Sequence, residues 1–270
     1  MNEAAEPRET ERSGARERAS RRRLRPPVQR TPLAPRELVL RSLDVARPGK
    51  LTIVVGPRGY GKSTALAQWW ARLTEQGIAA AWYTASDLDR EPDVFLEMVA
   101  RSLAVAGVDM GDAMRPKTGD SPAATMLDAI LLQLDRDERP IVLIIDDFDR
   151  IDHPGIARLV EDMADALPDR VHLVLATRRK PSLAVSVLRT QGVVRIIDPA
   201  ELRLGDAELA AALDLPADSP ELAAIAEQTE GWPVAVQLYR LWRGRMGVSA
   251  RVPRFSGQVD EGADYLAEQV

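Results

Sequence analysis

Short apolar runs alternate with amphipathic stretches along residues 51–197. The apolar runs, which predict β-strands, are Leu51–Val55, Ala80–Ala85, Ile141–Ile145, Val171–Ala176 and Val193–Ile197. The stretches between them predict helices near Lys62–Glu75, Asp93–Val105, Ala123–Leu134, Gly155–Ala166 and Ser182–Arg189. Because strands that alternate with helices form parallel sheets covered on both faces, we expect an α/β fold with a five-stranded parallel sheet flanked by helices.

The segments on either side of this region have a different pattern. Residues 37–46, ELVLRSLDVA, predict a short amphipathic helix, so we expect the α/β domain to cover residues 31–200. Beyond it the strand pattern stops, and Asp206–Leu213, Glu221–Gln228 and Pro233–Leu241 predict a small all-helical domain over residues 201–245. Residues 246–270 are irregular until a final helix near Ala263.

Residues 1–30 are rich in arginine, glutamate and proline and have almost no apolar side chains. Such a segment cannot bury enough apolar surface to offset the entropy of ordering, so we expect a disordered tail of mixed charge. Arg21–Arg23 lie in this tail and could touch nucleic acid. For so short a run, a solvated basic stretch is the favoured interpretation.

The segment Gly56–Thr64, GPRGYGKST, fits the P-loop pattern G-x-x-x-x-G-K-[ST] and lies between a predicted strand and a predicted helix. Gly56, Gly59 and Gly61 allow the backbone to curl so that its N–H groups converge on phosphate oxygens at a helix N-terminus. The competing interpretation is an ordinary glycine-rich turn, which the flanking strand and helix disfavour. This segment therefore predicts a nucleotide-phosphate site.

Three side chains at the end of the motif have expected roles. Lys62 places an ammonium between the β- and γ-phosphates, the Ser63 hydroxyl binds Mg²⁺, and Thr64 donates to the α-phosphate. Only four of the 36 basic residues in the chain are lysine, which makes a lysine at this position more telling. We therefore expect ATP or ADP with Mg²⁺ as cofactors.

The ends of two later strands supply candidate catalytic residues. Asp146 and Asp147 follow Ile141–Ile145 directly, which is typical of a Walker B strand. Asp146 is expected to hold Mg²⁺ and Asp147 to polarise the attacking water, while Asp149 is interpreted as a turn residue or helix N-cap. Arg178 and Arg179 follow the next strand, and a cation there could sense the γ-phosphate. The sequence does not decide between these two arginines.

Composition excludes several other classes of site. The net charge is −5 with a pI near 5.3, so no overall basic field favours nucleic acid or anionic lipid. The chain has no cysteine and two histidines, which excludes disulfides, thiolate metal sites and the commoner zinc sites. No apolar run reaches the about 18 residues of a membrane span, and the first residues lack a secretory pattern. We expect a cytoplasmic protein.

Together these segments resemble the MalT-type large ATP-binding regulators of the LuxR superfamily, a branch of the STAND class of P-loop ATPases. The resemblance runs from about Thr31 to the end of the chain. It rests on an ordered set of segments, which are GPRGYGKST with ALAQWW, AWYTASDLDREPDVFLEMVARSL, IIDDFDRID, VHLVLATRRKPSL, LRLGDAELAAAL and EQTEGWPVAVQLYRL.

The resemblance implies a P-loop domain with five strands, followed by a small helical domain. It also implies that Gly231-Trp232-Pro233 is a GxP motif whose proline, Pro233, packs by the adenine. Taken alone, these residues favour a simpler interpretation, in which glycine ends one helix and proline begins the next. The resemblance likewise supports Arg178 as the γ-phosphate sensor.

The chain departs from the family at two places. Arg58 stands at a P-loop position that the family usually gives to a small residue. The family continues through a winged helix, a helical-repeat sensor and a DNA-binding helix-turn-helix, whereas this sequence ends in FSGQVDEGADYLAEQV, similar to the lead-in of the winged helix. We therefore expect no sequence-specific DNA binding by this chain alone.

These observations favour an ATP-binding signalling switch with slow Mg²⁺-dependent hydrolysis, which could act through self-association or a regulatory protein partner. The alternative is a stand-alone turnover ATPase or a small-molecule kinase of the P-loop class. A kinase would need an arginine-bearing lid, for which the alanine-rich helices after residue 200 offer no clear candidate. A nucleic-acid-binding protein acting through its basic tail is disfavoured by the acidic balance of the chain.

Overall fold

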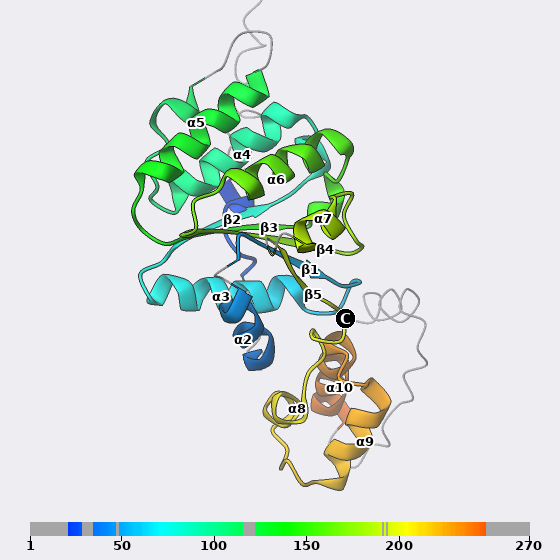
Figure 1. The fold of residues 1–270 in the computed structure, drawn as a ribbon. Coiled ribbons are helices and arrows are strands. Elements are labelled where there is room, and N and C mark those ends of the chain that lie inside the picture. Colours follow the sequence, from blue (N-terminus) through cyan, green and yellow to red (C-terminus); the bar gives the residue numbers. More distant parts are fainter. Residues whose placement is uncertain are drawn as a thin grey trace, which may run out of the picture.

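The computed structural model describes residues 21–28, 35–46, 49–115, 122–190, 192 and 194–246. A parallel sheet in the strand order β2-β3-β4-β1-β5 forms its centre (Figure 1). The strands are β1 (Leu51–Val55), β2 (Ala79–Thr84), β3 (Ile141–Asp146), β4 (Val171–Thr177) and β5 (Val194–Ile197). The predicted five-stranded parallel sheet is confirmed.

Helices precede, connect and follow these strands. They are α2 (Glu37–Ala46), α3 (Lys62–Glu75), α4 (Pro92–Val105), α5 (Pro122–Arg136), α6 (Pro154–Ala166), α7 (Val185–Thr190), α8 (Asp206–Leu213), α9 (Pro220–Thr229) and α10 (Pro233–Met246). Three 3₁₀ turns, η1 (Asp87–Asp89), η2 (Gly111–Met114) and η3 (Phe148–Arg150), lie between them. None of the helices in the described ranges has both the length and the apolar character of a membrane span.

The predicted helix Ser182–Arg189 begins later than expected, at Val185. The backbone amide of Ser182 donates to the carboxylate of Asp152, and the amide of Ala184 donates to the carboxylate of Glu161. These two carboxylates satisfy backbone N–H groups ahead of the helix, which have no intrahelical partner. The predicted final helix near Ala263 and the segment 247–270 lie outside the described residues.

Helices cover both faces of the sheet (Figure 1). On one face, residues such as Ile53 and Leu173 pack with apolar side chains of α4, α5, α6 and α7. On the other face, the neighbouring positions Val54, Ile144 and Val174 pack against α2 and α3. Because successive side chains of a strand point to opposite faces, both of which are covered, the central strands are apolar at most positions. The buried polar residues Thr52 of β1 and His172 of β4 hydrogen-bond to each other at 3.0 Å.

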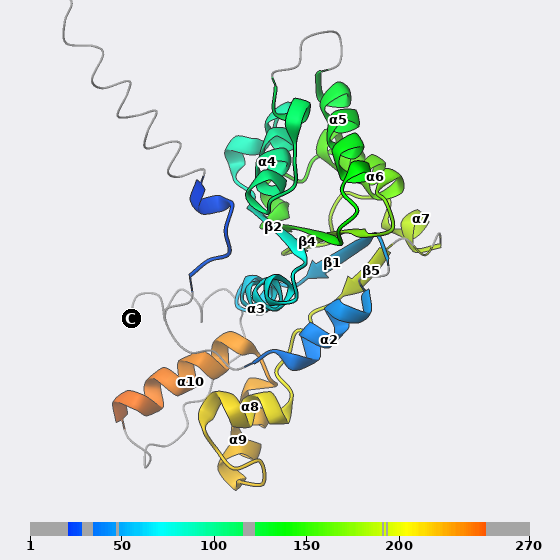
Figure 2. The ribbon, with the colours of Figure 1, turned by 90° about the vertical axis from the view of Figure 1, so that its left-hand side faces the viewer.

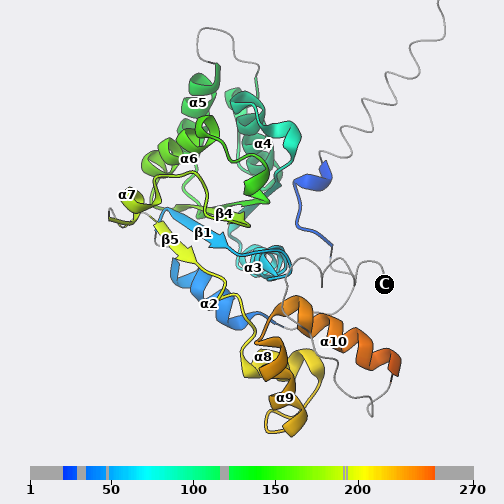
Figure 3. The ribbon, with the colours of Figure 1, turned by 90° about the vertical axis from the view of Figure 1, so that its right-hand side faces the viewer.

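Helices α8, α9 and α10 form a separate cluster with a core of its own, beneath α2 and α3 in Figure 3. That core contains Leu209, Ile225, Val236 and Tyr239, and the Tyr239 hydroxyl donates to the Glu221 carboxylate at 2.8 Å. The predicted group of three short helices after the sheet is therefore confirmed, and with it the fold class.

The strand order places three loops at one edge of the sheet. β1 lies between β4 and β5, and β3 lies beside β4, so the carboxyl ends of β1, β3 and β4 are neighbours. The backbone amide of Gly56, the first residue after β1, donates to the carbonyl of Thr177 at the end of β4 at 3.1 Å. The loops after β1, β3 and β4 therefore form one site.

The segment 21–28 lies beside β2 and α4 (Figure 2), and Arg23 and Leu24 contact them although most of the segment is exposed. Leu24 is buried in the core on that face, and Arg23 forms an ion pair with Asp89 in η1. Asp89 is 1% exposed and also accepts hydrogen bonds from the Tyr83 hydroxyl and the Ser86 amide. The prediction of a solvated tail is therefore wrong for two residues. Arg23 pairs with the buried Asp89 carboxylate, and Leu24 packs in the apolar core.

We expect the Arg23→Ala variant to lower the free energy of unfolding by about 1–2 kcal/mol, because the buried Asp89 carboxylate loses its cation. Chemical denaturation measures this change. Arg22→Ala, which removes an exposed arginine from the same segment, is the control and should change stability by less than about 0.5 kcal/mol. Equal effects of the two variants would contradict the assigned contact.

Candidate functional site

The P-loop connects β1 to α3, which begins at Lys62. Gly59 and Gly61 adopt the left-handed conformation, with φ of 80° and 72°. A side chain at Gly59 would also place its Cβ 2.6 Å from the Val234 Cγ1, so both the backbone and the space require glycine there. Gly56 holds the loop against β4, as described above. The three predicted glycines thus shape one loop.

Lys62 is buried beneath this loop, with 8% of its surface exposed. Its Nζ donates to the carbonyls of Gly56 and Pro57 at 2.5 and 3.2 Å. Burial lowers the pKa of Lys62 below its ordinary value, and the nearby Asp146 carboxylate opposes that shift. The ammonium therefore sits where P-loop carbonyls converge, within reach of a phosphate bound by the loop.

Asp146 ends β3 and is 3% exposed. Its carboxylate accepts hydrogen bonds from the Ser63 hydroxyl and from the Asp147 amide. Burial raises the pKa of Asp146 to about 6, and the hydrogen bond from Ser63 opposes that shift. The structure thus brings together Ser63 and Asp146, the two predicted metal ligands.

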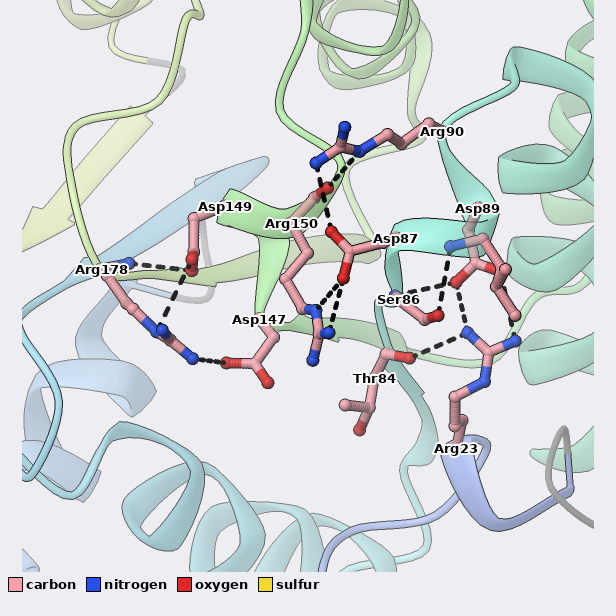
Figure 4. Close-up of polar contacts among 11 residues, drawn as sticks. Arg23, Thr84, Ser86, Asp87, Asp89, Arg90, Asp147, Asp149, Arg150 and Arg178 are labelled. Carbon is pink, nitrogen blue, oxygen red and sulfur yellow. Dashed lines mark hydrogen bonds and ion pairs between the residues drawn. The ribbon is translucent and has the colours of Figure 1, made fainter. Parts of the chain in front are cut away.

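Asp147 and Arg178 face each other across the ends of β3 and β4 (Figure 4). Asp147 has a φ of 54°, a left-handed conformation that is uncommon without glycine. An Asp147 Oδ1 lies 3.7 Å from an Arg178 Nη2. Asp149 accepts a hydrogen bond from the Arg178 amide at 3.2 Å and lies 3.6 Å from its Nε.

These contacts bear on two sequence interpretations. Asp149 is a turn residue of η3, as one of its two interpretations expected, and not the N-cap, which is Asp147; it also contacts the backbone and side chain of Arg178. Arg178 lines the pocket described below, whereas Arg179 is exposed. Geometry therefore favours Arg178 over Arg179 as the cation nearest the site.

A pocket of about 390 Å³ lies between the P-loop, the end of β4 and the helices α8 and α10. Eight predicted site residues line it, namely Gly59, Gly61, Lys62, Ser63, Thr64, Asp147, Arg178 and Pro233. Gly56 and Asp146 do not line it, because Gly56 lies at the base of the loop and Asp146 lies behind Ser63. The remaining lining residues are Arg36, Arg58, Leu204, Ala212, Val234, Val236, Gln237 and Arg240.

The start of α10 touches the P-loop directly. The Val234 amide donates to the Gly59 carbonyl at 3.1 Å, and the rings of Tyr60 and Trp232 have centroids 6.2 Å apart. Pro233 is the first residue of α10, as the simpler interpretation expected, and it also lines the pocket. Gly231 has a φ of 70°, and a Cβ there would lie 2.4 Å from the Leu204 carbonyl oxygen.

Two cations in the pocket, Arg36 and Arg240, escaped the sequence analysis. Arg36 is 3% exposed, donates to the Leu202 carbonyl and lies 3.9 Å from the Glu208 carboxylate. Burial lowers its pKa, and its Nε, buried in the pocket wall, has no hydrogen-bond partner. An isolated arginine before a helix belongs to no general motif, so the only signal was its position directly before ELVLRSLDVA.

The pocket fits a polyphosphate with Mg²⁺. Its lining includes five cationic side chains, from Arg36, Arg58, Lys62, Arg178 and Arg240, and one carboxylate, from Asp147. No three His, Asp or Glu side chains of the described residues converge to hold a metal by themselves. A metal beside Ser63 and Asp146 would therefore take its other ligands from phosphates or water, as Mg²⁺ commonly does.

Comparison with known proteins agrees with this geometry. The family described as the AAA ATPase domain matches residues 35–176, which is more than half of the chain. The chain belongs to the AAA ATPase domain family. Nucleotide binding follows for this AAA ATPase domain, since the match includes the P-loop, Asp146 and Asp147.

The resemblance to MalT-type regulators is confirmed by similarity along about nine tenths of this chain. The chain is 27% identical over 256 residues to the HTH-type transcriptional regulator MalT of Cronobacter sakazakii (strain ATCC BAA-894), covering 90% of this chain and 28% of that protein. It is 25% identical over 245 residues to the MalT of Serratia proteamaculans (strain 568), covering 87% and 27%. The chain thus spans less than a third of the length of these relatives.

Among solved structures, Cdc6p from Pyrobaculum aerophilum has a similar fold. The TM-score is 0.50 and the identity is 20%, over 68% of this chain and 49% of that one. This similarity supports the fold of the AAA ATPase domain.

We expect Asp146→Asn to raise the free energy of unfolding of the nucleotide-free protein by about 1–3 kcal/mol at pH 7. The folded pKa of about 6 lies above the ordinary value, so the ionised carboxylate destabilises the fold and wild-type stability falls as pH rises from about 4 to 6. Chemical denaturation at pH 7 and at pH 4.5 measures the difference, which should shrink at the lower pH. A variant less stable than the wild type at pH 7 would contradict this prediction.

Proposed function

We propose that this AAA ATPase domain binds ATP with Mg²⁺ and acts as a switch, as the nucleotide-binding portion of a MalT-type transcriptional regulator. In this proposal residues 31–200 bind the phosphates, and the helical residues 201–245 change their orientation with the nucleotide state. Slow hydrolysis resets the switch. Similarity to two proteins named HTH-type transcriptional regulator MalT over about nine tenths of the chain supports the regulatory role.

The contact between the P-loop and α10 carries the proposal. The Gly59 carbonyl accepts a hydrogen bond from the Val234 amide, and Pro233 and Val234 line the same pocket as Lys62. The helical cluster therefore forms one wall of the pocket and the P-loop forms another. A ligand that contacts both walls binds one arrangement of the two parts better than others, and this differential affinity is the requirement for a switch.

Each site residue has a role in the proposal. Lys62 binds the β- and γ-phosphates, Thr64 binds the α-phosphate, and Ser63 and Asp146 hold the metal. Mg²⁺, when bound, neutralises charge on the phosphate oxygens. Asp147 accepts a proton from the attacking water as a general base, and Arg178 senses the γ-phosphate. Pro233 packs against the adenine.

The alternative is a turnover ATPase or a small-molecule kinase, and one observation favours it. Arg240 on α10 lines the pocket, so the helical cluster does present an arginine where a kinase lid would. The sequence interpretation found no such candidate. We favour the switch because the relatives that cover most of the chain are regulators, and the rate of hydrolysis separates the two functions.

We expect Lys62→Ala to weaken ATP binding by about ten- to a hundredfold, because a buried charge-assisted hydrogen bond to phosphate is lost. Lys62→Arg should also weaken binding, since a planar guanidinium cannot replace a compact ammonium under the loop. Calorimetry measures both affinities. Wild-type affinity in both variants would contradict the P-loop assignment.

We expect Asp147→Asn to keep Mg²⁺–ATP binding and to lose most hydrolysis, because the variant removes the base and keeps the shape of the side chain. Phosphate release over hours, measured together with ATP affinity, separates the two effects. Hydrolysis at the wild-type rate would mean that another group polarises the water.

We expect the wild-type protein to hydrolyse ATP well below the ~10 s⁻¹ median of enzymes, because a switch must stay in one nucleotide state long enough to be read. Steady-state phosphate release with saturating Mg²⁺–ATP measures this rate. Turnover near the median without any partner would favour the alternative function.

A further inference from the structure

Arg58 is a charged residue of the P-loop to which the proposed function gives no role. It lies between Pro57 and Gly59, lines the pocket and is exposed. It forms no hydrogen bond or ion pair with any other residue that the structure describes. Unlike an arginine paired at a surface, its guanidinium can turn toward a bound anion without breaking an existing contact.

The position of Lys62 places Arg58 at the terminal-phosphate end of the pocket. The Lys62 Nζ lies 3.2 Å from the carbonyl oxygen of Pro57, and that carbonyl is bonded to the Arg58 nitrogen. In a P-loop this ammonium reaches the β- and γ-phosphates. The start of the loop also lies beside β4, because the Gly56 amide donates to the carbonyl of Thr177, the residue before Arg178. The other end of the loop leads into α3.

The charges already at this end do not balance a terminal phosphate. Asp146, Asp147 and Asp149 lie close enough to act on Lys62, and so does Arg178. Arg178 is itself held by two of these carboxylates, at 3.7 Å from Asp147 and 3.6 Å from Asp149. Even with Mg²⁺ bound beside Asp146, a γ-phosphate lies near Asp147 and Asp149 and near an arginine that these two carboxylates partly neutralise, so a further cation is favourable there.

We propose that Arg58 binds the γ-phosphate of ATP from within the same chain and makes the site prefer ATP to ADP. This inference rests on the proposed function and adds Arg58 to Arg178 as a second residue that responds to the γ-phosphate. ADP ends at the β-phosphate, which Lys62 and the loop amides bind in both nucleotides. The contribution of Arg58 is therefore specific to the triphosphate.

The test compares the affinities for ADP and for a non-hydrolysable ATP analogue, measured by calorimetry with Mg²⁺ at fixed salt. Arg58→Ala should weaken binding of the analogue about tenfold and change ADP binding less than twofold, because an exposed charge-assisted hydrogen bond is at the low end of its range. Arg58→Lys should give an intermediate preference, since it keeps the charge and loses the planar fork. Arg189→Ala, an exposed arginine of α7, is matched in charge and should leave the preference unchanged.

Thermal unfolding and ADP binding report whether each variant is folded. An ATP-to-ADP affinity ratio that stays at the wild-type value in Arg58→Ala, or that falls equally in Arg189→Ala, would overturn the role of Arg58 and leave the proposed function standing. A wild-type protein that binds neither nucleotide would overturn the proposed function, and the inference with it.

Discussion

The position of β1 between β4 and β5 determines where the chemistry of this protein lies. The loop that leaves β1 is held to the end of β4 by the hydrogen bond from the Gly56 amide to the Thr177 carbonyl. In a parallel sheet all strands end at the same edge, so the P-loop, the carboxylates after β3 and the arginine after β4 converge. A different strand order with the same motifs would leave these groups apart.

Convergence of these groups has an energetic cost. Lys62 and Asp146 are both buried. Burial lowers the pKa of Lys62 and raises the pKa of Asp146, and each shift favours the neutral form of the side chain. Asp147 is held in a left-handed conformation without being glycine. Such local costs are common at functional sites, where a rigid core on both faces of the sheet offsets them. Lys62, Asp146 and Asp147 lie at one edge of the sheet, next to largely apolar central strands.

Contact between the P-loop and α10 joins the core of the helical cluster to the core of the sheet, in addition to the contacts of Arg36 and Leu38 with Glu208. Gly59 and Gly231 are both left-handed, and each has backbone or side-chain atoms of another segment where a Cβ would lie. Gly59 lets α10 approach the loop closely enough for the Val234 amide to donate to its carbonyl, and Gly231 lets the turn before α10 approach Leu204, whose amide donates to the Gly231 carbonyl at 2.8 Å. Arg36, which lies just before α2, also lines this pocket, and it contacts the Leu202 carbonyl and the Glu208 carboxylate.

The sequence by itself determined the features that depend on residues close together along the chain. Periodicity located the strands and most helices, and the local motif from Gly56 to Thr64 located the phosphate loop, because these features arise from spacings of a few residues. Tertiary structure decided the contacts that join distant segments. It distinguished Arg178 from Arg179, gave Asp149 a partner, brought Arg36 and Pro233 to the loop, and docked Arg23 on Asp89. No local pattern encodes these contacts, because they depend on the strand order and on which buried carboxylate or carbonyl needs a partner.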